Sequence, residues 1–156
     1  MSRKDYFDDP AAPSVTRIVP AVTAFVRDER GFLLLERRSD NGQWGMPGGV
    51  QEIGENISQT VVREVAEETG VTVEVIGLVG IFTDPGHVIE FSDGEVRQEF
   101  SLCFRARPVA GKISVSSESF EVRWVDPAEL QSLDMSPTTR RRIVEGMKDL
   151  PTPVIS

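Results

Sequence analysis

The sequence is poor in the residues that disulfide-stabilised domains need, with one cysteine and one histidine among its 156 residues. Cys103 alone cannot form an intramolecular disulfide, and its neighbours in SLCFRA predict a buried thiol in a strand. The histidine, His87, follows Pro85 and Gly86, which favours a surface or hydrogen-bonding role over catalysis. This cysteine usage is typical of a cytoplasmic protein.

Long hydrophobic runs are missing as well. The most apolar stretches, such as Ile18–Val26, are far shorter than the roughly 20 residues that cross a bilayer. The opening residues, MSRKDYFDDP, contain no hydrophobic signal core. We therefore expect neither a membrane span nor secretion through a signal peptide, and we expect the protein in the cytoplasm.

Basic residues are in the minority, because 17 Lys and Arg face 25 Asp and Glu and give a formal net charge of −8. This charge opposes non-specific binding to nucleic acid or to anionic lipid. We therefore expect neither as a partner. If the ligand is itself an anion, a cation must mediate its binding.

The length and the hydrophobic content of 39% are enough for one sizeable core but hardly for two, which predicts a single domain. We place this domain at residues 17–150 and a short C-terminal tail at residues 151–156. Residues 1–16 are polar and lack a clear period, so they predict an arm outside the core that is loosely ordered unless it docks somewhere.

The order of apolar patterns predicts strands interrupted by one helix and closed by another. Strands in RIVPAVTAFV and FLLLERR flank a turn at 28–31 like a hairpin, and the glycine-rich segment 39–55 is a shaped loop. Asn56–Thr69 is expected to be a helix, with Asn56 or Ser58 as its N-cap and Gly70 as the left-handed residue after it. Further elements are expected in VTVEVIGLVGIFT, in a hairpin from about 87 to 109, in EVRWV, and in an amphipathic helix at 138–150. This order predicts an α/β fold with a mixed sheet.

The central helix carries three carboxylates on one side. At 100° per residue, Glu64, Glu67 and Glu68 fall within an arc of about 100°, and Glu68 projects only about 20° from the apolar Val61. Carboxylates crowded at the edge of a core repel each other unless a cation lies among them. Mg²⁺ or Mn²⁺ suits such oxygen ligands, and Mg²⁺ commonly binds phosphate oxygens as well. The alternative is that these glutamates are ordinary surface residues of a good helix.

These residues also resemble a known family. Gly49, Glu55 and the run Arg63–Val71 (REVAEETGV) resemble the complete Nudix box of the MutT-like hydrolases. The lead-in WGMPGG and the later Arg123–Leu130 resemble the family as well, so the resemblance extends from about Val19 to Leu150. It implies the Nudix fold, an α/β/α sandwich around a mixed β-sheet. It also implies hydrolysis of a nucleoside diphosphate linked to another group.

The resemblance further implies a role for each residue of the motif. It implies that the metal ligands are Glu64, Glu67 and Glu68, with the carbonyl oxygen of Gly49 beside them. An extra ligand is expected on a later loop, where Glu118 is the first choice and Glu95, Glu99 and Glu121 are the competitors.

The implied reaction is attack of a metal-activated water on one phosphorus of a pyrophosphate, with Glu64 or Glu118 as the proton acceptor. Glu55 and Arg63 take a supporting role, in which their ion pair pins the loop to the helix so that the Gly49 carbonyl meets the carboxylates. The alternative for this pair is an unimportant exposed salt bridge.

The substrate is left open by the sequence. Pro85 lies near the place of a proline that marks ADP-ribose-cleaving members, but a turn proline explains it equally well. Tyr6 as the only tyrosine argues against dinucleoside-polyphosphate hydrolases, and one cysteine excludes the zinc ribbon of the NADH-cleaving subclass. Aromatic residues such as Trp44 and Phe100 could stack on a base or belong to the core. Two classes of candidate substrate remain. One is a nucleoside triphosphate, including an oxidised one, and the other is ADP-ribose or another nucleotide sugar.

Two other expectations concern function and assembly. Some Nudix domains bind nucleotides as sensors without hydrolysing them, although such domains often have a broken motif, and a purely structural protein would show no metal dependence. Self-association is common in the family, so a homodimer is expected, and the arm at residues 1–16 could cross to the partner subunit.

Overall fold

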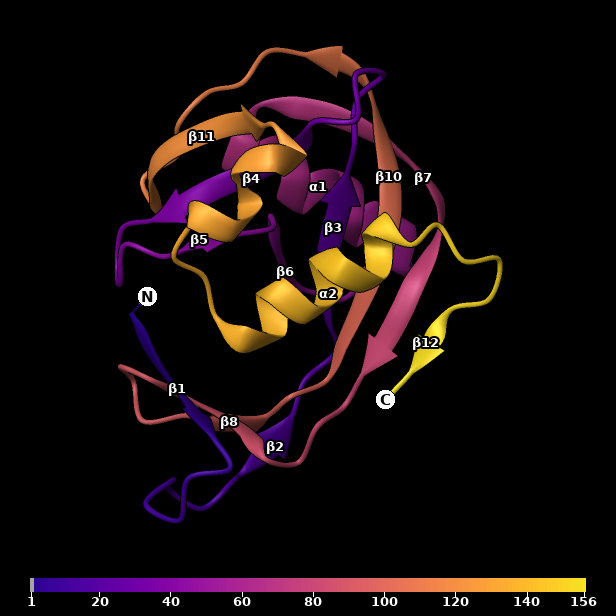
Figure 1. Cartoon of the computed structure of the whole chain (residues 1–156). Coiled ribbons are helices and arrows are strands. Elements are labelled where there is room, and N and C mark those ends of the chain that lie inside the picture. Colours follow the sequence, from indigo (N-terminus) through magenta and orange to yellow (C-terminus); the bar gives the residue numbers. More distant parts are fainter. Residues whose placement is uncertain (1) are drawn as a thin grey trace.

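A five-stranded mixed sheet forms the centre of the computed structural model, which describes residues 2–156 (Figure 1). Its strand order is β12-β7-β10-β3-β6, in which β10 is parallel to β3 and antiparallel to β7. The strands are β3 (Ala21–Val26), β6 (Gly48–Val50), β7 (Val71–Phe82), β10 (Ser101–Gly111) and β12 (Val154–Ile155).

Two helices cover opposite faces of this sheet. Successive side chains of β3 point alternately to the two faces, so β3 contributes to the core under both helices. Val22, Ala24 and Val26 pack in one cluster with Val61 and Val65 of α1 (Ile57–Thr69). On the other face, Phe25 of β3 and Cys103 of β10 pack in a second cluster with Ile143 of α2 (Pro137–Met147). The expected α/β/α sandwich with a mixed sheet is therefore present, and Cys103 is the buried strand thiol that the sequence indicated.

Two smaller sheets complete the fold. One has the order β11-β4-β5, with β4 (Leu33–Arg38), β5 (Trp44–Gly45) and β11 (Ser119–Val125), and it is followed by a 3-10 helix, η1 (Pro127–Ser132). The other has the order β1-β8-β9-β2, with β1 (Arg3–Phe7), β2 (Arg17–Ile18), β8 (His87–Phe91) and β9 (Val96–Gln98). Among residues 2–156, no helix is long and apolar enough to span a membrane.

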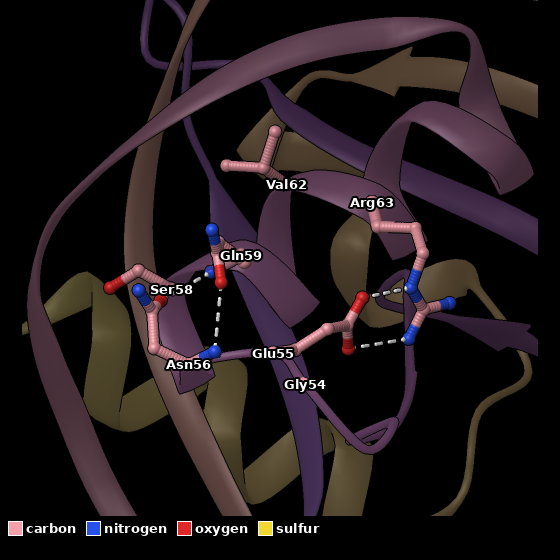
Figure 2. Close-up of a pocket in the computed structure, with 7 residues that line it drawn as sticks. All are labelled: Gly54, Glu55, Asn56, Ser58, Gln59, Val62 and Arg63. Atoms are coloured by element: carbon pink, nitrogen blue, oxygen red, sulfur yellow. Dashed lines mark hydrogen bonds and ion pairs between the residues drawn. The ribbon is translucent and has the colours of Figure 1, made fainter.

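Helix α1 begins and ends where local signals predicted. Asn56 is the N-cap, its side chain accepts from Gln59 N, and the Gln59 side chain accepts from Asn56 N in return (Figure 2). At the other end, Gly70 adopts φ 77° and donates its backbone N–H to Ala66 O. Both predicted caps are confirmed, because each depends on residues within one turn of the helix.

The first expected hairpin is reduced to one bridge, whereas the second is formed around the expected turn but is shorter than expected. Across the turn at 28–31, one isolated bridge joins Arg27 to Leu33. Beyond it, β3 and β4 belong to different sheets. The reason is that β4 is buried on both faces, with Leu34 in the α1-side cluster and Leu35 in the α2-side cluster. In the second hairpin, β8 pairs with β9 around Ser92–Gly94, whereas β10 leaves to pair with β7 and β3.

The N-terminal segment is a strand of this chain and not a loosely ordered arm. Its strand β1 pairs antiparallel with β8, so the expectation that residues 1–16 stay outside the core is wrong for this part. Tyr6 packs in a small buried cluster with Val88 and Val96, and its hydroxyl donates to Glu90 at 2.8 Å. The partners lie more than 80 positions away in the sequence, so no local pattern could reveal the pairing. The segment that could have crossed to a second subunit is engaged within its own chain.

Candidate active site

One cavity of about 950 Å³ brings together most of the residues that the sequence singled out. It is lined by the strand β6, by one side of α1, by the loop before β11 and, on the far side, by β1, β8 and α2. One side, called here the acidic wall, consists of Glu36, Glu64, Glu67, Glu68 and Glu118. Five carboxylates therefore line one side of the space in which a ligand would bind.

Glu55 and Arg63 form the ion pair that links the glycine-rich loop to α1 (Figure 2). Arg63 donates through Nε and Nη2 to the two oxygens of Glu55, and Nη2 also donates to Val50 O at 3.0 Å. Thr60 donates its hydroxyl to Glu55 at 2.9 Å. Mainly because of the hydrogen bonds from Arg63, the pKa of Glu55 is lowered to about 2, so this carboxylate stays ionised. The pair fixes the loop against the helix beside the acidic wall.

The backbone of β6 lies directly against two of the carboxylates. Gly48 donates its N–H to Glu68 Oε2 at 2.9 Å. A Cβ atom on Gly49 would overlap the carboxylate of Glu64, so only glycine allows that carboxylate to lie so close to the strand. Glu64 also accepts from Arg63 Nη1 at 2.8 Å, whereas the Glu67 side chain is 60% exposed.

Burial of Glu36 and Glu68 and partial burial of Glu64 make this part of the acidic wall a poor environment for uncompensated negative charge, whereas Glu67 and Glu118 are exposed. Burial raises the pKa of Glu68 well above its usual range, and the charge of Glu36 raises it further. Burial likewise raises the pKa of Glu64, although the hydrogen bond and charge of Arg63 oppose the shift. Hard divalent cations bind such oxygen donors, so this donor set fits Mg²⁺ or Mn²⁺. Within residues 2–156, however, no three acidic, His or Cys side chains converge closely enough to hold an ion.

Glu36 belongs to the acidic wall and was missed by the sequence analysis. It comes from β4, it is 7% exposed, and it accepts a hydrogen bond from Ser119 at 3.1 Å. Its burial raises its pKa to about 7. A charged residue at the end of the apolar run LLLE normally marks the exposed end of a strand, so the sequence contains no signal for this position.

Of the candidate loop glutamates, Glu118 is the one that lines the acidic wall. Its backbone carbonyl accepts from Ser39 N at 3.0 Å, and its charge contributes to the raised pKa of Glu64 and Glu68. Glu95 pairs with Arg97 and Glu121 pairs with Arg123, and neither lines the cavity. The third competitor, Glu99, lines the opposite side.

The opposite side of the cavity carries a buried network around His87, so of the surface and hydrogen-bonding roles that the sequence favoured, the structure shows the hydrogen-bonding one. His87 is 2% exposed, and its Nε2 lies 2.7 Å from Asp5 Oδ1 of β1. Its Nδ1 lies 3.5 Å from Glu99, which also pairs with Arg142 of α2. Arg3 contacts Asp5 at 3.1 Å. This side, called here the network wall, ties the N-terminal strand to the last helix.

The network wall should make stability depend on pH. Burial alone would lower the pKa of His87, but its hydrogen bond to Asp5 and the nearby carboxylate of Glu99 outweigh burial and raise the pKa above 6.5. The stability that His87 contributes is therefore fully present below pH 6.5 and lost as the pH rises through its folded pKa. For Asp5 and Glu99, burial alone would raise the pKa, but the neighbouring His87 and the charge of Arg3 or Arg142 lower the pKa below 3.8 and 4.5, so their contribution is lost only in more acidic solution.

The difference in unfolding free energy between wild type and His87→Gln should thus be largest near pH 5 to 6 and should shrink toward pH 9. Urea unfolding at a series of pH values measures it. A difference that grows with pH would contradict the assigned network.

Comparison with known proteins identifies the family. A family model described as NUDIX domain matches residues 17–146. The chain belongs to the Nudix family. It is 41% identical over 110 residues to a MutT-like protein of Streptomyces ambofaciens, and this alignment covers 70% of the chain and 65% of the relative. It is 29% identical over 120 residues to an ADP-ribose pyrophosphatase of Methanocaldococcus jannaschii, with 72% and 64% covered. The chain thus spans just under two thirds of the length of these two Nudix relatives.

Solved Nudix structures share the fold. A MutT protein from Methanosarcina mazei matches with a TM-score of 0.65 and 27% identity, over 86% of this chain and 96% of that chain. A Nudix hydrolase from Nitrosomonas europaea matches with a TM-score of 0.70 and 22% identity, over 88% and 94%. The α/β/α sandwich is therefore the Nudix fold.

Proposed function

We propose that this Nudix protein is a Mg²⁺-dependent hydrolase that cleaves the pyrophosphate linkage of a nucleoside diphosphate derivative. The observation that carries the proposal is the acidic wall, where Glu64 and Glu68 of the Nudix motif lie against the backbone of β6 with raised pKa values. A bound cation would relieve this repulsion and would bind phosphate oxygens in an otherwise acidic protein.

The proposed ligands are the side chains of Glu64, Glu67, Glu68 and Glu118 and the carbonyl oxygen of Gly49, with Mn²⁺ as an alternative to Mg²⁺. The cation would lower the pKa of a water molecule and neutralise phosphate charge. Glu55 and Arg63 hold the loop in place. Glu64 or Glu118 accepts the proton of the attacking water.

The substrate class rests on the relatives and on the size of the cavity. One relative is an ADP-ribose pyrophosphatase, and another, a nucleoside triphosphatase from Enterobacter, is 28% identical over 126 residues. Small-molecule sites commonly have volumes of about 300–1,000 Å³, so the cavity is large enough for a nucleotide. We therefore propose a nucleoside triphosphate or a nucleotide sugar as the substrate, with no nucleic acid partner.

The decisive experiment is phosphate release from purified protein with Mg²⁺ and a panel of nucleotides. The panel contains nucleoside triphosphates, oxidised dGTP, ADP-ribose, other nucleotide sugars and diadenosine polyphosphates. Turnover that is lost in EDTA and in Glu67→Gln would support the proposal. Binding without turnover would instead support a nucleotide sensor, and activity that is unchanged in EDTA would exclude the metal-dependent mechanism.

The variant Glu118→Gln distinguishes between Glu118 and Glu64 as the acceptor of the water proton. If Glu118 reaches the cation or the water, we expect kcat to fall by about 10²-fold or more at unchanged stability, because a general base contributes about 10²–10⁴. Glu121→Gln, on the neighbouring strand and outside the cavity, is the matched control. Steady-state rates of both variants measure the effect, and a mild change in Glu118→Gln would leave Glu64 as the base.

A cytoplasmic location and a homodimer also stay predictions. In the single chain β1 pairs with β8, so the proposed dimer does not need the N-terminal arm to cross to the partner. Sedimentation of the purified protein measures the oligomeric state.

A further inference from the structure

One face of the sheet β1-β8-β9-β2, at the bottom of Figure 1, lines the cavity. On β8, every second residue from His87 to Phe91 lines it, and the two residues between them do not. One of these two, Val88, packs on the other face of the sheet with Tyr6. Since successive side chains of a strand point to opposite faces, the side chains of Ile89 and Phe91 point into the cavity.

Ile89 and Phe91 take no part in a hydrophobic core. Both are half-buried, and among residues 2–156 neither belongs to any of the three clusters of packed apolar side chains. Ligand sites are lined predominantly by apolar and aromatic side chains. The two side chains are therefore apolar surface that the packing of the protein does not use and that a ligand in the cavity can contact.

Arg97 of β9 lies over the ring of Phe91. Its Cζ is 4.3 Å from the ring centroid, and Arg97 lines the same cavity. At this distance a guanidinium is attracted to the face of an aromatic ring. Nε and Nη2 of Arg97 each donate to Glu95 at 2.9 Å, and this bidentate pair holds the guanidinium in a fixed orientation. Phe91 and Arg97, with Ile89 on the same strand as Phe91, are called here the stacking platform.

The stacking platform suits a flat group. Nucleobases stack on aromatic rings and on the planes of Arg guanidinium groups, and both surfaces are present here. The platform also lies on the far side of the cavity from the acidic wall. In a nucleotide whose phosphates lie at the acidic wall, the base is the flat group that reaches the other side, whereas a sugar has no such flat face.

We propose that the base of a nucleotide substrate stacks on this platform, against Phe91 and Arg97 and beside Ile89. The inference rests on the proposed nucleotide substrate and adds how its base is recognised. Every nucleobase has a flat face, so stacking accepts all of them with similar affinity. We therefore expect a protein that requires a base on its ligand but distinguishes poorly between bases.

The test compares AMP with ribose 5-phosphate, which is AMP without its base, by calorimetric titration with Mg²⁺. Neither contains a phosphoanhydride, so turnover does not interfere, and the contribution of the shared phosphate cancels in the ratio of the affinities. We expect AMP, GMP and UMP each to bind at least about tenfold more tightly than ribose 5-phosphate. Equal binding of AMP and ribose 5-phosphate, including no binding of either, would overturn the proposal. So would tighter binding of one base alone, because this indicates recognition of the edge of a base and not of its face.

Three variants test the residues of the platform. Phe91→Leu keeps an apolar side chain but loses the flat ring, so it should reduce the affinity ratio of AMP to ribose 5-phosphate at least about threefold. Phe91→Trp keeps a flat ring and should preserve the ratio. Arg97→Lys keeps a charge for Glu95 but loses the guanidinium plane, and it should reduce the ratio as well.

Phe120→Leu is the matched control. Phe120 is an exposed aromatic residue of β11 that lies outside the cavity lining, and the Cζ of Arg37 is 6.0 Å from its ring centroid. Melting temperatures show whether each variant folds, and if Phe91→Leu does not fold, Arg97→Lys decides. A ratio that the platform variants leave as unchanged as the control does would contradict the assignment.

The two proposals fail separately. If the ratio depends on Phe91 and Arg97 but no nucleotide is hydrolysed with Mg²⁺, base stacking stands and the hydrolase proposal fails. If anhydrides are hydrolysed but AMP binds no more tightly than ribose 5-phosphate, the hydrolase stands and the stacking proposal fails.

Discussion

Glu68→Gln is expected to remove most of the metal-dependent turnover while the metal-free protein stays about as stable as wild type. A cation contributes several kcal/mol to phosphate-transition-state stabilisation, so weakening its binding should lower kcat by about 10³-fold. Stability should be preserved because the Glu68 carboxyl is 8% exposed and its pKa is well above the usual range through burial and Glu36. The metal-free protein therefore already holds this group largely protonated, and glutamine has nearly the same shape. Its amide oxygen can still accept from Gly48 N.

Two measurements check this prediction. The first is the steady-state rate with Mg²⁺, and the second is the melting temperature with and without Mg²⁺. Wild type should melt at a higher temperature with the ion, and the variant should show little shift. Glu74→Gln is the matched control, because Glu74 is an exposed carboxylate on β7 paired with Arg107. A Glu68→Gln enzyme with a near-normal rate would remove Glu68 from the metal site.

The helix and its glutamates could be predicted because their signals are local. The caps Asn56 and Gly70 act within one turn, and the positions of Glu64 and Glu68 follow from helical geometry beside the apolar face. The mixed sheet with helices packed on it also followed from the order of strands and helices, and the α/β/α sandwich followed from the resemblance to the Nudix family. These features need no knowledge of which distant segments meet.

The remaining parts of the site depend on pairings between distant segments. Glu36 enters the acidic wall because β4 is buried on both faces and pairs with β11. Asp5 reaches His87 because β1 docks on β8, and Arg142 reaches Glu99 because α2 covers the sheet. Each contact joins residues that are more than 40 positions apart in the sequence, so neither spacing nor composition could reveal it.

Alanine substitutions at the two adjacent glycines of β6 should have different effects. Gly48→Ala should lower the stability of the protein, and Gly49→Ala should lower its activity. Neither has a positive φ, so alanine causes no backbone strain at either position, and the difference lies in what its Cβ meets. At Gly48, the Cβ would overlap the carbonyl oxygen of Val22 in the paired strand β3. Backbone in a sheet cannot move aside easily, so we expect a loss of about 2–4 kcal/mol of unfolding free energy.

At Gly49, the three atoms nearest to the Cβ would all belong to the carboxylate of Glu64, the far end of a flexible side chain. Gly49→Ala should therefore fold with a loss of roughly 1 kcal/mol or less, because only that side chain has to rotate. A shift of a catalytic group by about 1 Å can lower the rate about 10²-fold, and we expect a loss of this size.

Gly77→Ala on β7 is the control for both variants, because its Cβ would meet Arg105 at an ordinary 3.9 Å. Urea unfolding and the steady-state rate with Mg²⁺ separate the two effects. If Gly48→Ala had the same free energy of unfolding as Gly77→Ala, β6 would not lie as close to β3 as the structure shows. If Gly49→Ala kept the wild-type rate, the carboxylate of Glu64 would not need its place against β6. Since the proposed metal site requires that carboxylate and the Gly49 carbonyl side by side, a normal rate would also count against the site itself.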